Sequence, residues 1–301
     1  MSIIIYPDNN FKMSYNGTSV KMPQSFTFPG GEVQTRVPNV NVLSTDYTNR
    51  DTPILIATRL VNAEKIIELG QTVDILKRKG FENISAFVPY IPYMQQDRVM
   101  TDSLMDTPAE YSESFALSVF AKIINTFKLK NVFCVDPHST VTNDNMIGGL
   151  RALSNIKYIR RAATTADGQV DFLVAPDEGA IKKTLGYSLA LKIPYIISFK
   201  RRNVLTGKIE GVNLPKEEGE KITDKTVLIT DDICVGGMTF LELAKELRKY
   251  NPKKIKLFVT HGIFNKGTSL EGIDEIYCTN SCRDLPDTHS FTQLYLVAPN
   301  V

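Results

Sequence analysis

The sequence predicts an α/β fold class with two similar domains, each built on a mainly parallel β-sheet flanked by helices. Three observations lead to this expectation. The chain has 301 residues, about twice the length of an ordinary single domain. Short runs rich in β-branched residues alternate with longer amphipathic stretches, which is the pattern of βαβ units. The same alternation starts again in the second half, so we place the N-terminal domain at 1–150 and the C-terminal domain at 151–301.

The first half contains three expected strands and two expected helices. The strands are short apolar runs, and the helices have apolar residues at helical spacing. Asp102–Thr107 has the composition of a loop. In chain order, the expected elements are a strand at 52–58, a helix at 63–79, a strand at 84–90, a helix at 108–127 and a strand at 131–137.

The second half repeats this style after a boundary that we expect between Ile147 and Thr164, where the strand pattern is weak. Residues 200–223 are rich in charge, glycine and proline, which indicates an excursion over the surface, with a hairpin as one form it could take. The expected elements are strands at 170–176, 193–199, 225–232, 255–264 and 274–280, and helices at 178–191 and 239–250.

Composition and charge exclude several classes of protein. The chain has 35 Lys and Arg against 33 Asp and Glu, so its net charge of +2 gives no electrostatic reason to expect nucleic acid or an anionic membrane as partner. No apolar run reaches the roughly 20 residues needed to cross a bilayer, and the start MSIIIYPDNN lacks a secretory pattern. None of the four cysteines is in C-x-x-C spacing, so we expect a reduced, cytoplasmic protein without structural zinc.

The most informative segment is VLITDDICVGGMTF, residues 227–240. A buried strand ends there in two carboxylates, Asp231 and Asp232, and a helix opens near Thr239 after Gly236 and Gly237. Ligands of open α/β sheets bind at the carboxyl ends of the strands. Glycines let backbone N–H groups approach a phosphate, and a helix N-terminus favours an anion. Paired aspartates can accept hydrogen bonds from the vicinal hydroxyls of a ribose, so the segment predicts a ribose-phosphate site.

This segment resembles the phosphoribosyl-diphosphate loop of the type I phosphoribosyltransferase fold. Six other segments, in order along nearly the whole chain, resemble motifs of one family with that fold, the ribose-phosphate diphosphokinases, also called phosphoribosyl diphosphate synthetases. The segments are FPGGEV (28–33), PYIPYMQQDR (89–98), VDPHS (135–139), APDEGA (175–180), FKRR (199–202) and VTHGIF (259–264). Any one match is weak, whereas six in the right order and spacing are specific.

The resemblance implies two phosphoribosyltransferase-type domains with the active site between them. It implies an enzyme that moves the β,γ-diphosphoryl group of ATP to the anomeric hydroxyl of a ribose 5-phosphoryl acceptor and releases AMP, with Mg²⁺ as cofactor. Such phosphoryl chemistry needs alignment and charge neutralisation more than covalent help. At positions matching the family's motifs, the resemblance implies catalytic roles for Lys200 and Arg202 and metal binding for His138 and Asp177.

The resemblance also implies the substrate contacts and an assembly. ATP would bind at Phe28, which would stack on adenine, and at Glu32, Gln96, Asp97 and Arg98. In the family that Phe and Glu come from a neighbouring subunit, so a homo-oligomer is implied, dimer-based and as large as a hexamer in one reading. The ribose-phosphate loop would comprise Asp231, Asp232, Val235, Gly236, Gly237, Met238 and Thr239.

The chain departs from the family pattern in ways that bear on the substrates. Gly30 and Gln95 stand where the family has an aspartate and an arginine in the ATP motifs, and Val235, Gly236 and Met238 replace an aspartate, a threonine and a glycine of the loop. Of the loop's threonine hydroxyls, only that of Thr239 remains for a terminal phosphate. We therefore hypothesise a larger acceptor, ADP-ribose, whose product ADP-ribose 1-diphosphate could feed NAD synthesis, with ribose 5-phosphate as a close competitor.

Two other kinds of function stay open. A phosphoribosyltransferase would consume the activated sugar instead of making it, and a catalytically inactive regulatory homologue would do neither. The ATP-type motifs FKRR, VDPHS and PYIPYMQQDR argue against the first. The retained Lys200, Arg202, Asp177 and His138 argue against the second. His261 lies on an expected buried strand and is expected to be a hydrogen-bonded structural residue.

Overall fold

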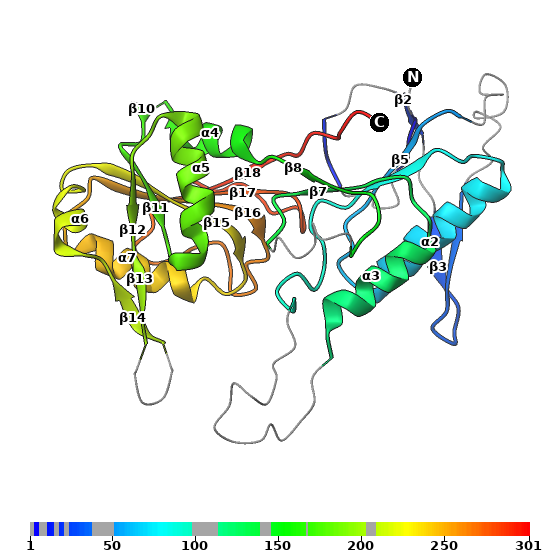
Figure 1. Ribbon diagram of the computed structural model, residues 1–301, viewed down its shortest axis with the longest axis horizontal. Helices are drawn as coiled ribbons and strands as arrows, with labels where there is room; N and C mark the ends of the chain where they lie inside the picture. Colours follow the sequence, from blue (N-terminus) through cyan, green and yellow to red (C-terminus); the bar gives the residue numbers. More distant parts are fainter. Residues whose placement is uncertain are drawn as a thin grey trace. The chain divides into compact units, whose positions relative to one another are not determined.

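The chain forms two compact units, shown in Figure 1. The first comprises residues 1–153 together with 296–301, and the second comprises 154–295. The computed structural model describes residues 3–5, 11–14, 18–20, 24–37, 51–97, 114–138, 146–166, 168–202 and 209–301. No helix among these residues is long and apolar enough to cross a bilayer.

The first unit is built on a six-stranded sheet in the order β2-β1-β5-β6-β7-β8, and every pairing in it is parallel. All four residues of β5 and of β6 are buried, as expected for parallel strands covered on both faces. The strands are β1 (Ile3–Ile5), β2 (Thr18–Val20), β5 (Ile54–Ala57), β6 (Ile84–Phe87), β7 (Val132–Val135) and β8 (Leu150–Leu153).

Two helices, α2 (Ala63–Arg78) and α3 (Ala116–Thr126), pack against this sheet. The Asn62 side chain caps α2 by accepting a hydrogen bond from the Lys65 N–H at 3.0 Å. Leu69 of α2 and Phe120 of α3 join Ile54 of β5 in one buried apolar cluster. The periodic apolar residues of the sequence therefore become the contact between helices and sheet.

A two-stranded antiparallel hairpin, β3 (Gln24–Thr27) and β4 (Val33–Arg36), lies beside α2. The side chain of Gln71 on α2 fixes it: its Nε2 donates to the Val33 carbonyl at 2.7 Å, and its Oε1 accepts from the Thr35 N–H at 2.7 Å. The side-chain amide of Gln71 thus forms the hydrogen bonds to β4 that a further strand would otherwise form at this edge of the hairpin.

The second unit repeats the first in outline, with a six-stranded, fully parallel sheet in the order β12-β11-β15-β16-β17-β18. Its strands are β11 (Phe172–Ala175), β12 (Tyr195–Ile197), β15 (Thr226–Cys234), β16 (Lys254–Gly262), β17 (Glu275–Thr279) and β18 (Phe291–Leu294). The helices are α4 (Ile156–Ala163), α5 (Ile181–Leu191), α6 (Lys216–Glu220) and α7 (Met238–Arg248). Two short antiparallel pairs complete it: β9 (Thr164–Thr165) with β10 (Gly168–Gln169), and β13 (Phe199–Arg202) with β14 (Ile209–Asn213).

The fold class expected from the sequence is confirmed, and the boundary between the two units, after residue 153, lies within the expected range 147–164. Two details differ from the expectation. Residues 147–164 contain the edge strand β8 and helix α4, which the sequence does not reveal because β8 is short, is not fully buried and contains Arg151. Residues 296–301 belong to the first unit rather than to a domain at 151–301, because the main chain of Ser14 bonds to Leu296 and Ala298 at 3.0 and 3.1 Å. The excursion at 200–223 contains the β13–β14 hairpin and α6. Of the helix expected at 108–127, residues 116–126 are helical, and 108–113 lie outside the described residues, as does the loop 102–107.

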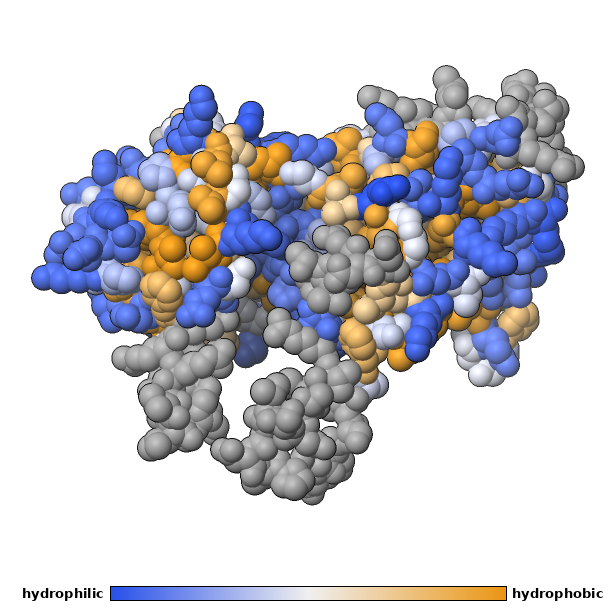
Figure 2. Space-filling view, viewed as in Figure 1, coloured by the Kyte–Doolittle hydropathy of each residue, from blue (hydrophilic) through white to orange (hydrophobic). Residues whose placement is uncertain are grey.

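Some apolar side chains face outward on the helices. In α5 only Thr184 is fully buried, while Leu185 and Leu189 are 39% and 72% exposed. Figure 2 shows apolar side chains gathered on this face of the second unit in the region of α5. On α3 of the first unit, Val119 and Ile123 are 51% and 40% exposed. Adjacent exposed apolar residues of this kind are typical of surfaces that become covered by a partner.

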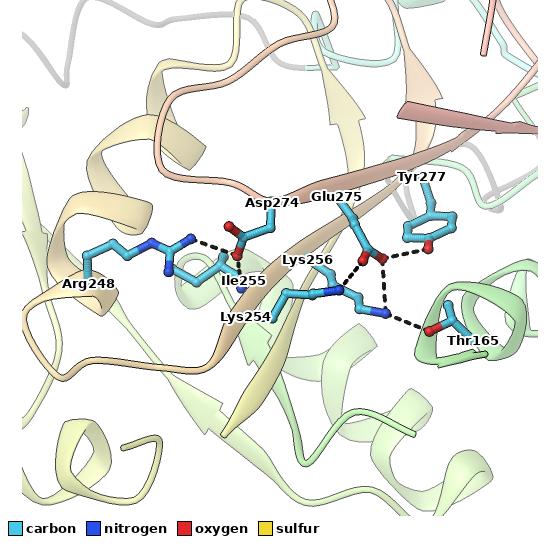
Figure 3. Close-up of polar contacts among 8 residues, drawn as sticks. All are labelled: Thr165, Arg248, Lys254, Ile255, Lys256, Asp274, Glu275 and Tyr277. Atoms are coloured by element: carbon cyan, nitrogen blue, oxygen red, sulfur yellow. Dashed lines mark hydrogen bonds and ion pairs between the residues drawn. The ribbon is translucent and has the colours of Figure 1, made fainter. Parts of the chain in front are cut away.

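A charge network around one buried lysine lies at the amino-terminal ends of β16 and β17 (Figure 3). Lys256, only 1% exposed, places its Nζ 3.0 Å from Glu275 Oε2 and 2.9 Å from Thr165 Oγ1. Glu275 also accepts hydrogen bonds from Lys254 at 2.6 Å and from the Tyr277 hydroxyl at 2.8 Å. Partial burial alone would raise the pKa of Glu275, but these three donors outweigh burial and lower its pKa to about 2.

We predict that Glu275→Gln destabilises the protein by on the order of 2–3 kcal/mol at pH 7, because it leaves the ammonium of Lys256 buried without its counter-charge. The folded-state pKa of Glu275 is lower than its ordinary value of 4.5, so the wild-type advantage is complete above pH 4.5 and is lost as pH falls towards 2. Denaturant unfolding across this pH range measures the difference. The matched control is Glu242→Gln, which breaks an exposed pair with Lys245 and should leave the free energy of unfolding almost unchanged. Equal effects of the two substitutions would contradict the prediction.

Candidate active site

Two carboxylates lie at the carboxyl end of β15, beside the end of its neighbour β11. Asp232 is 5% exposed, and its Oδ2 forms an ion pair at 2.8 Å with Nζ of Lys183 from α5. Asp231 Oδ1 accepts a hydrogen bond from the Asp232 N–H at 2.8 Å. The two side chains therefore have different partners although they are adjacent in sequence.

A third carboxylate, Asp177, follows β11 and lies close enough to act electrostatically on Asp231. Its Oδ1 accepts from the Ala180 N–H at 3.1 Å, capping the short 3₁₀ helix Glu178–Ala180. Two hydroxyls, Thr184 Oγ1 and Thr230 Oγ1, meet 3.2 Å apart beneath the carboxylates. The carboxyl ends of β11 and β15 thus gather three carboxylates and one ammonium in one place.

The pKa of Asp231 is raised. Burial is the largest cause, followed by the charge of Asp232, and the charge of Asp177 adds to both. The N–H of Asp232 and the ammonium of Lys183 oppose this shift without cancelling it. Asp231 therefore holds a proton more strongly than an ordinary aspartate. With Asp232 paired to Lys183, the two can present both a hydrogen-bond donor and an acceptor to a vicinal diol.

The loop after β15 leads directly into α7. Gly237 is the N-cap of α7 with φ +79°, and a Cβ there would lie 2.6 Å from Leu270 Cδ2, so only glycine fits. No side chain caps the first turn of α7. The Phe240 N–H donates to the Gly237 carbonyl at 3.0 Å, and the N–H groups of Met238 and Thr239 are left to an anion or to water. The helix begins at Met238, one residue before the expected start. Val235 and Met238 are 37% and 56% exposed, so the loop does present apolar side chains.

The segment after β16 holds this loop in place. The N–H groups of Ile263 and Phe264 both donate to the Cys234 carbonyl, at 2.9 and 3.2 Å, and the Asn265 N–H donates to the Val235 carbonyl at 3.0 Å. Cys234 itself is buried, and burial followed by the nearby Asp231 raises the pKa of its thiol to about 12. The loop therefore contains no thiolate at neutral pH.

Lys200 and Arg202, expected to be catalytic, lie on β13 of the hairpin that pairs with β14. The register shifts between Arg201 and Arg202, which marks a bulge in that strand. The structure describes the main chain of these residues and not their side chains.

The residues expected at ATP lie in the first unit. Phe28 and Glu32 flank the turn of the β3–β4 hairpin, where the Phe28 N–H donates to the Glu32 carbonyl at 2.8 Å. Both are exposed, and the Phe28 ring meets the edge of Phe26 with centroids 5.1 Å apart. Gln96 and Asp97 follow a short turn after β6, with Gln96 exposed and Asp97 half-buried. Arg98 lies outside the described residues.

Of the two residues expected to bind metal, His138 is exposed just beyond β7, and Asp177 follows β11. Among the residues that the structure describes, no group of three or more His, Cys, Asp or Glu side chains could hold a metal ion. Mg²⁺ commonly keeps several waters and binds through one or two carboxylates plus substrate phosphates. The oxygen donor of Asp177 fits such a minimal role.

Sequence reasoning missed Lys183 and the segment at 263–266. Lys183 follows APDEGA, and nothing in its neighbourhood marks it as a partner of Asp232, 49 residues away. Its place in the first turn of the helix that follows β11 could have placed it near the strand end. His261 was expected to be structural, which is confirmed: it is 1% exposed, and its Nδ1 lies 2.8 Å from Ser281 Oγ.

Comparisons with known proteins agree with this geometry. Residues 148–296 match the phosphoribosyl transferase domain. The ribose-phosphate pyrophosphokinase of Thermococcus kodakarensis is 28% identical over 259 residues, covering 84% of this chain and 83% of that protein. The protein of the same name from Mycoplasma pneumoniae is 28% identical over 218 residues, covering 72% of this chain and 62% of that protein. The chain is a divergent relative of the ribose-phosphate pyrophosphokinases.

The likeness extends to the solved structures. The phosphoribosylpyrophosphate synthetase of Mycobacterium smegmatis matches 98% of this chain and covers 94% of its own, with a TM-score of 0.69 and 18% sequence identity. At that identity the match shows the fold, two phosphoribosyltransferase-type domains, which agrees with the two parallel sheets described above. The resemblance to the ribose-phosphate pyrophosphokinase family expected from the motifs is confirmed.

We predict that Lys183→Met destabilises the protein by about 2 kcal/mol at pH 7, because it leaves the buried carboxylate of Asp232 without its ammonium. Asp232→Asn removes the charge that needs neutralising, so the double variant should recover part of the loss. Denaturant unfolding of the two single variants and the double variant gives a coupling energy, expected at about 1–2 kcal/mol. A coupling below about 0.5 kcal/mol would mean that the ion pair contributes nothing to the fold.

Proposed function

We propose that the chain is an ATP-dependent diphosphokinase that transfers the β,γ-diphosphoryl group of ATP to the anomeric hydroxyl of a ribose 5-phosphoryl acceptor and releases AMP. The observation that supports this most is the carboxylate pair Asp231–Asp232 leading into a glycine loop and an uncapped helix, in a relative of the ribose-phosphate pyrophosphokinases. We further propose that it works in the cytoplasm, without nucleic acid or membrane as partner.

The acceptor is held at two points of its ribose 5-phosphoryl unit. Asp231 and Asp232 take the vicinal hydroxyls of the ribose, and the N–H groups of the loop Val235–Thr239 with the start of α7 take the 5-phosphoryl group. This orientation leaves the anomeric hydroxyl free to attack the β-phosphorus of ATP. The new bond joins the anomeric oxygen to that phosphorus, and the bond between the phosphorus and the α,β-bridging oxygen breaks, so that AMP leaves.

Charge develops on the transferred diphosphoryl group during this exchange. We assign its neutralisation to the cations of Lys200 and Arg202 on the β13 strand. Asp177 and His138 are the residues proposed to hold Mg²⁺, which would supply further neutralisation of the phosphate charge. The adenine of ATP stacks on Phe28 with Glu32 beside it, and Gln96, Asp97 and Arg98 bind the rest of the nucleotide.

The relatives are named ribose-phosphate pyrophosphokinases, which makes ribose 5-phosphate one candidate acceptor for this chain, and ADP-ribose is the second. The exposed side chains of Val235 and Met238 favour the second, since they offer apolar contact to an acceptor that continues beyond its first phosphate. Its product, ADP-ribose 1-diphosphate, would serve NAD synthesis. A terminal phosphate monoester instead requires more donors than the Thr239 hydroxyl alone.

We propose that the chain forms a homo-oligomer built from dimers, with a hexamer as the larger form of this assembly. Phe28 and Glu32 lie exposed on a hairpin tip in the described part of the chain, as befits residues that complete the ATP site of a neighbour. The outward apolar residues of α3 and α5 supply surface that an assembly would cover.

Release of AMP distinguishes the proposed function from its alternatives. The pure protein is incubated with MgATP and either ribose 5-phosphate or ADP-ribose, and AMP is measured together with the diphosphorylated sugar. We expect AMP in equal amount to the sugar product. A phosphoribosyltransferase would instead consume phosphoribosyl diphosphate with a base, and an inactive homologue would form no AMP with either acceptor; both results would contradict the proposal.

We predict that Lys200→Ala and Arg202→Ala each lower kcat by about 100-fold or more, because a preorganised charge at the transition state is lost. Both lie on the two-stranded hairpin β13–β14, outside the six-stranded sheet, so the unfolding transition should change little. The control is Arg201→Ala, between them, to which the resemblance assigns no role. Activity within a few-fold of wild type in either test variant would remove that residue from the proposed machinery.

We predict a clear preference when kcat/KM is compared for the two acceptors at fixed MgATP. Charged hydrogen bonds are worth about 1.5–3 kcal/mol each, so the acceptor whose phosphate finds one more donor should be favoured by about tenfold or more. If the apolar loop decides the substrate, ADP-ribose is preferred. A tenfold preference for ribose 5-phosphate would defeat the larger-acceptor hypothesis and leave the diphosphokinase itself intact.

A further inference from the structure

A tight turn stands beside the ribose-phosphate loop and presents two polar side chains. The turn runs from Phe264 to Gly267, closed by the Gly267 N–H donating to the Phe264 carbonyl at 3.1 Å. Its two central residues are Asn265 and Lys266, both exposed. Nothing in the family motifs quoted above assigns a role to either residue.

The turn is fixed at both ends. On one side, the Phe264 and Asn265 N–H groups bond to the carbonyls of Cys234 and Val235 in the loop. On the other, the Phe264 carbonyl accepts from Arg283 Nη2 at 2.9 Å. The Phe264 ring, 2% exposed, meets the Phe291 ring edge-on with centroids 5.6 Å apart. The turn is therefore positioned by the core and the loop together.

One glycine makes this anchoring possible. A Cβ on Gly262 would lie 2.4 Å from the Phe264 ring, so only glycine allows the ring to fold back into the core. The main chain of the turn that follows is therefore held in a fixed register against the loop.

Lys266 lies directly beside the loop glycine that replaces the family's threonine. The point where a Cβ on Gly236 would sit is 3.4 Å from Asn265 Oδ1 and 3.8 Å from Lys266 Cδ and Cε. The ammonium of Lys266 is one bond beyond Cε, and among the described residues it has no hydrogen-bond or ion-pair partner. A branched side chain at position 236 would extend towards the space along which this lysine runs.

We propose that Lys266, with Asn265 beside it, recognises the 5-phosphoryl group of the acceptor, in place of the hydroxyl that the loop lost at Gly236. This inference rests on the proposed function, because it assumes that the loop binds a sugar phosphate. A cation and an amide replace one hydroxyl, so the loop recovers donors for a phosphate dianion. The gain is largest for a terminal monoester, whose phosphorus carries more charge than either phosphorus of a diphosphate. The turn therefore opposes the preference for ADP-ribose that the apolar side chains of Val235 and Met238 give, and it shifts the balance towards ribose 5-phosphate.

Binding measurements on the full-length protein test the proposal. Ribose 5-phosphate is titrated by calorimetry into wild type, Lys266→Met, Lys266→Arg and the control Lys216→Met. Lys216 serves as the control because it lies on α6, where its ammonium forms an exposed ion pair with Glu220 at 3.6 Å. We expect Lys266→Met to weaken binding by about tenfold or more, because a charged hydrogen bond is lost. Lys266→Arg should keep most of the affinity, and Lys216→Met all of it. KM for MgATP should not change in any variant.

Several results would overturn the proposal. Ribose 5-phosphate binding by Lys266→Met within twofold of wild type would remove Lys266 from the acceptor site, and an equal loss of MgATP affinity would assign its charge to the nucleotide. A wild-type protein that binds ribose 5-phosphate yet forms no AMP contradicts the proposed function alone, because the affinities of the variants for ribose 5-phosphate still test the role of Lys266. A wild-type protein that binds no sugar phosphate contradicts both.

Discussion

Two adjacent aspartates at the end of a buried strand are the constraint around which the second unit is arranged. Carboxylates in such a place are costly unless each has a partner. Asp232 has the ammonium of Lys183, and Asp231 has a main-chain N–H and a raised pKa that lets it keep its proton. The position of α5 follows, because its first turns must bring Lys183 over the end of β15. The same end of the strand then leads into the glycine loop, so charge compensation and phosphate binding share one piece of backbone.

Most of the fold could be predicted from the sequence because parallel strands covered on both faces have to be apolar throughout. β5 and β6 are such runs, and the amphipathic α2 between them is marked by Asn62 at its start and Gly80 after its end. β8 escaped prediction because this edge strand has two exposed residues between two half-buried ones, and therefore no such run. β18 and the tail after it escaped for another reason: their pairing is decided by distant strands, and no local pattern encodes it.

Some residues of the candidate site could likewise be predicted from one local segment, and others could not. Asp231, Asp232 and Gly237 are contiguous, and their chemistry can be recognised from one short segment. Lys183 and Lys266 lie 49 residues before and 34 residues after Asp232, and they become relevant only when strands β11, β15 and β16 are laid side by side. Motif comparison also treats Gly236 as a simple loss of a hydroxyl. The structure shows that the side chain of Lys266 runs through the space beside Gly236. The missing hydroxyl and the lysine therefore lie at the same place in the loop.

The pairing of Ser14 with residues 296–298 has a consequence for how the protein is made. The two main-chain bonds that join them connect the first unit to a segment that the ribosome synthesises only after the entire second unit. During translation the first unit can form its parallel sheet, but it lacks this closing contact until the second unit has emerged. The second unit is in effect an insertion within the first, so a fragment ending at the boundary would be missing part of its own unit. The order of synthesis therefore differs from the order in which the units can be completed.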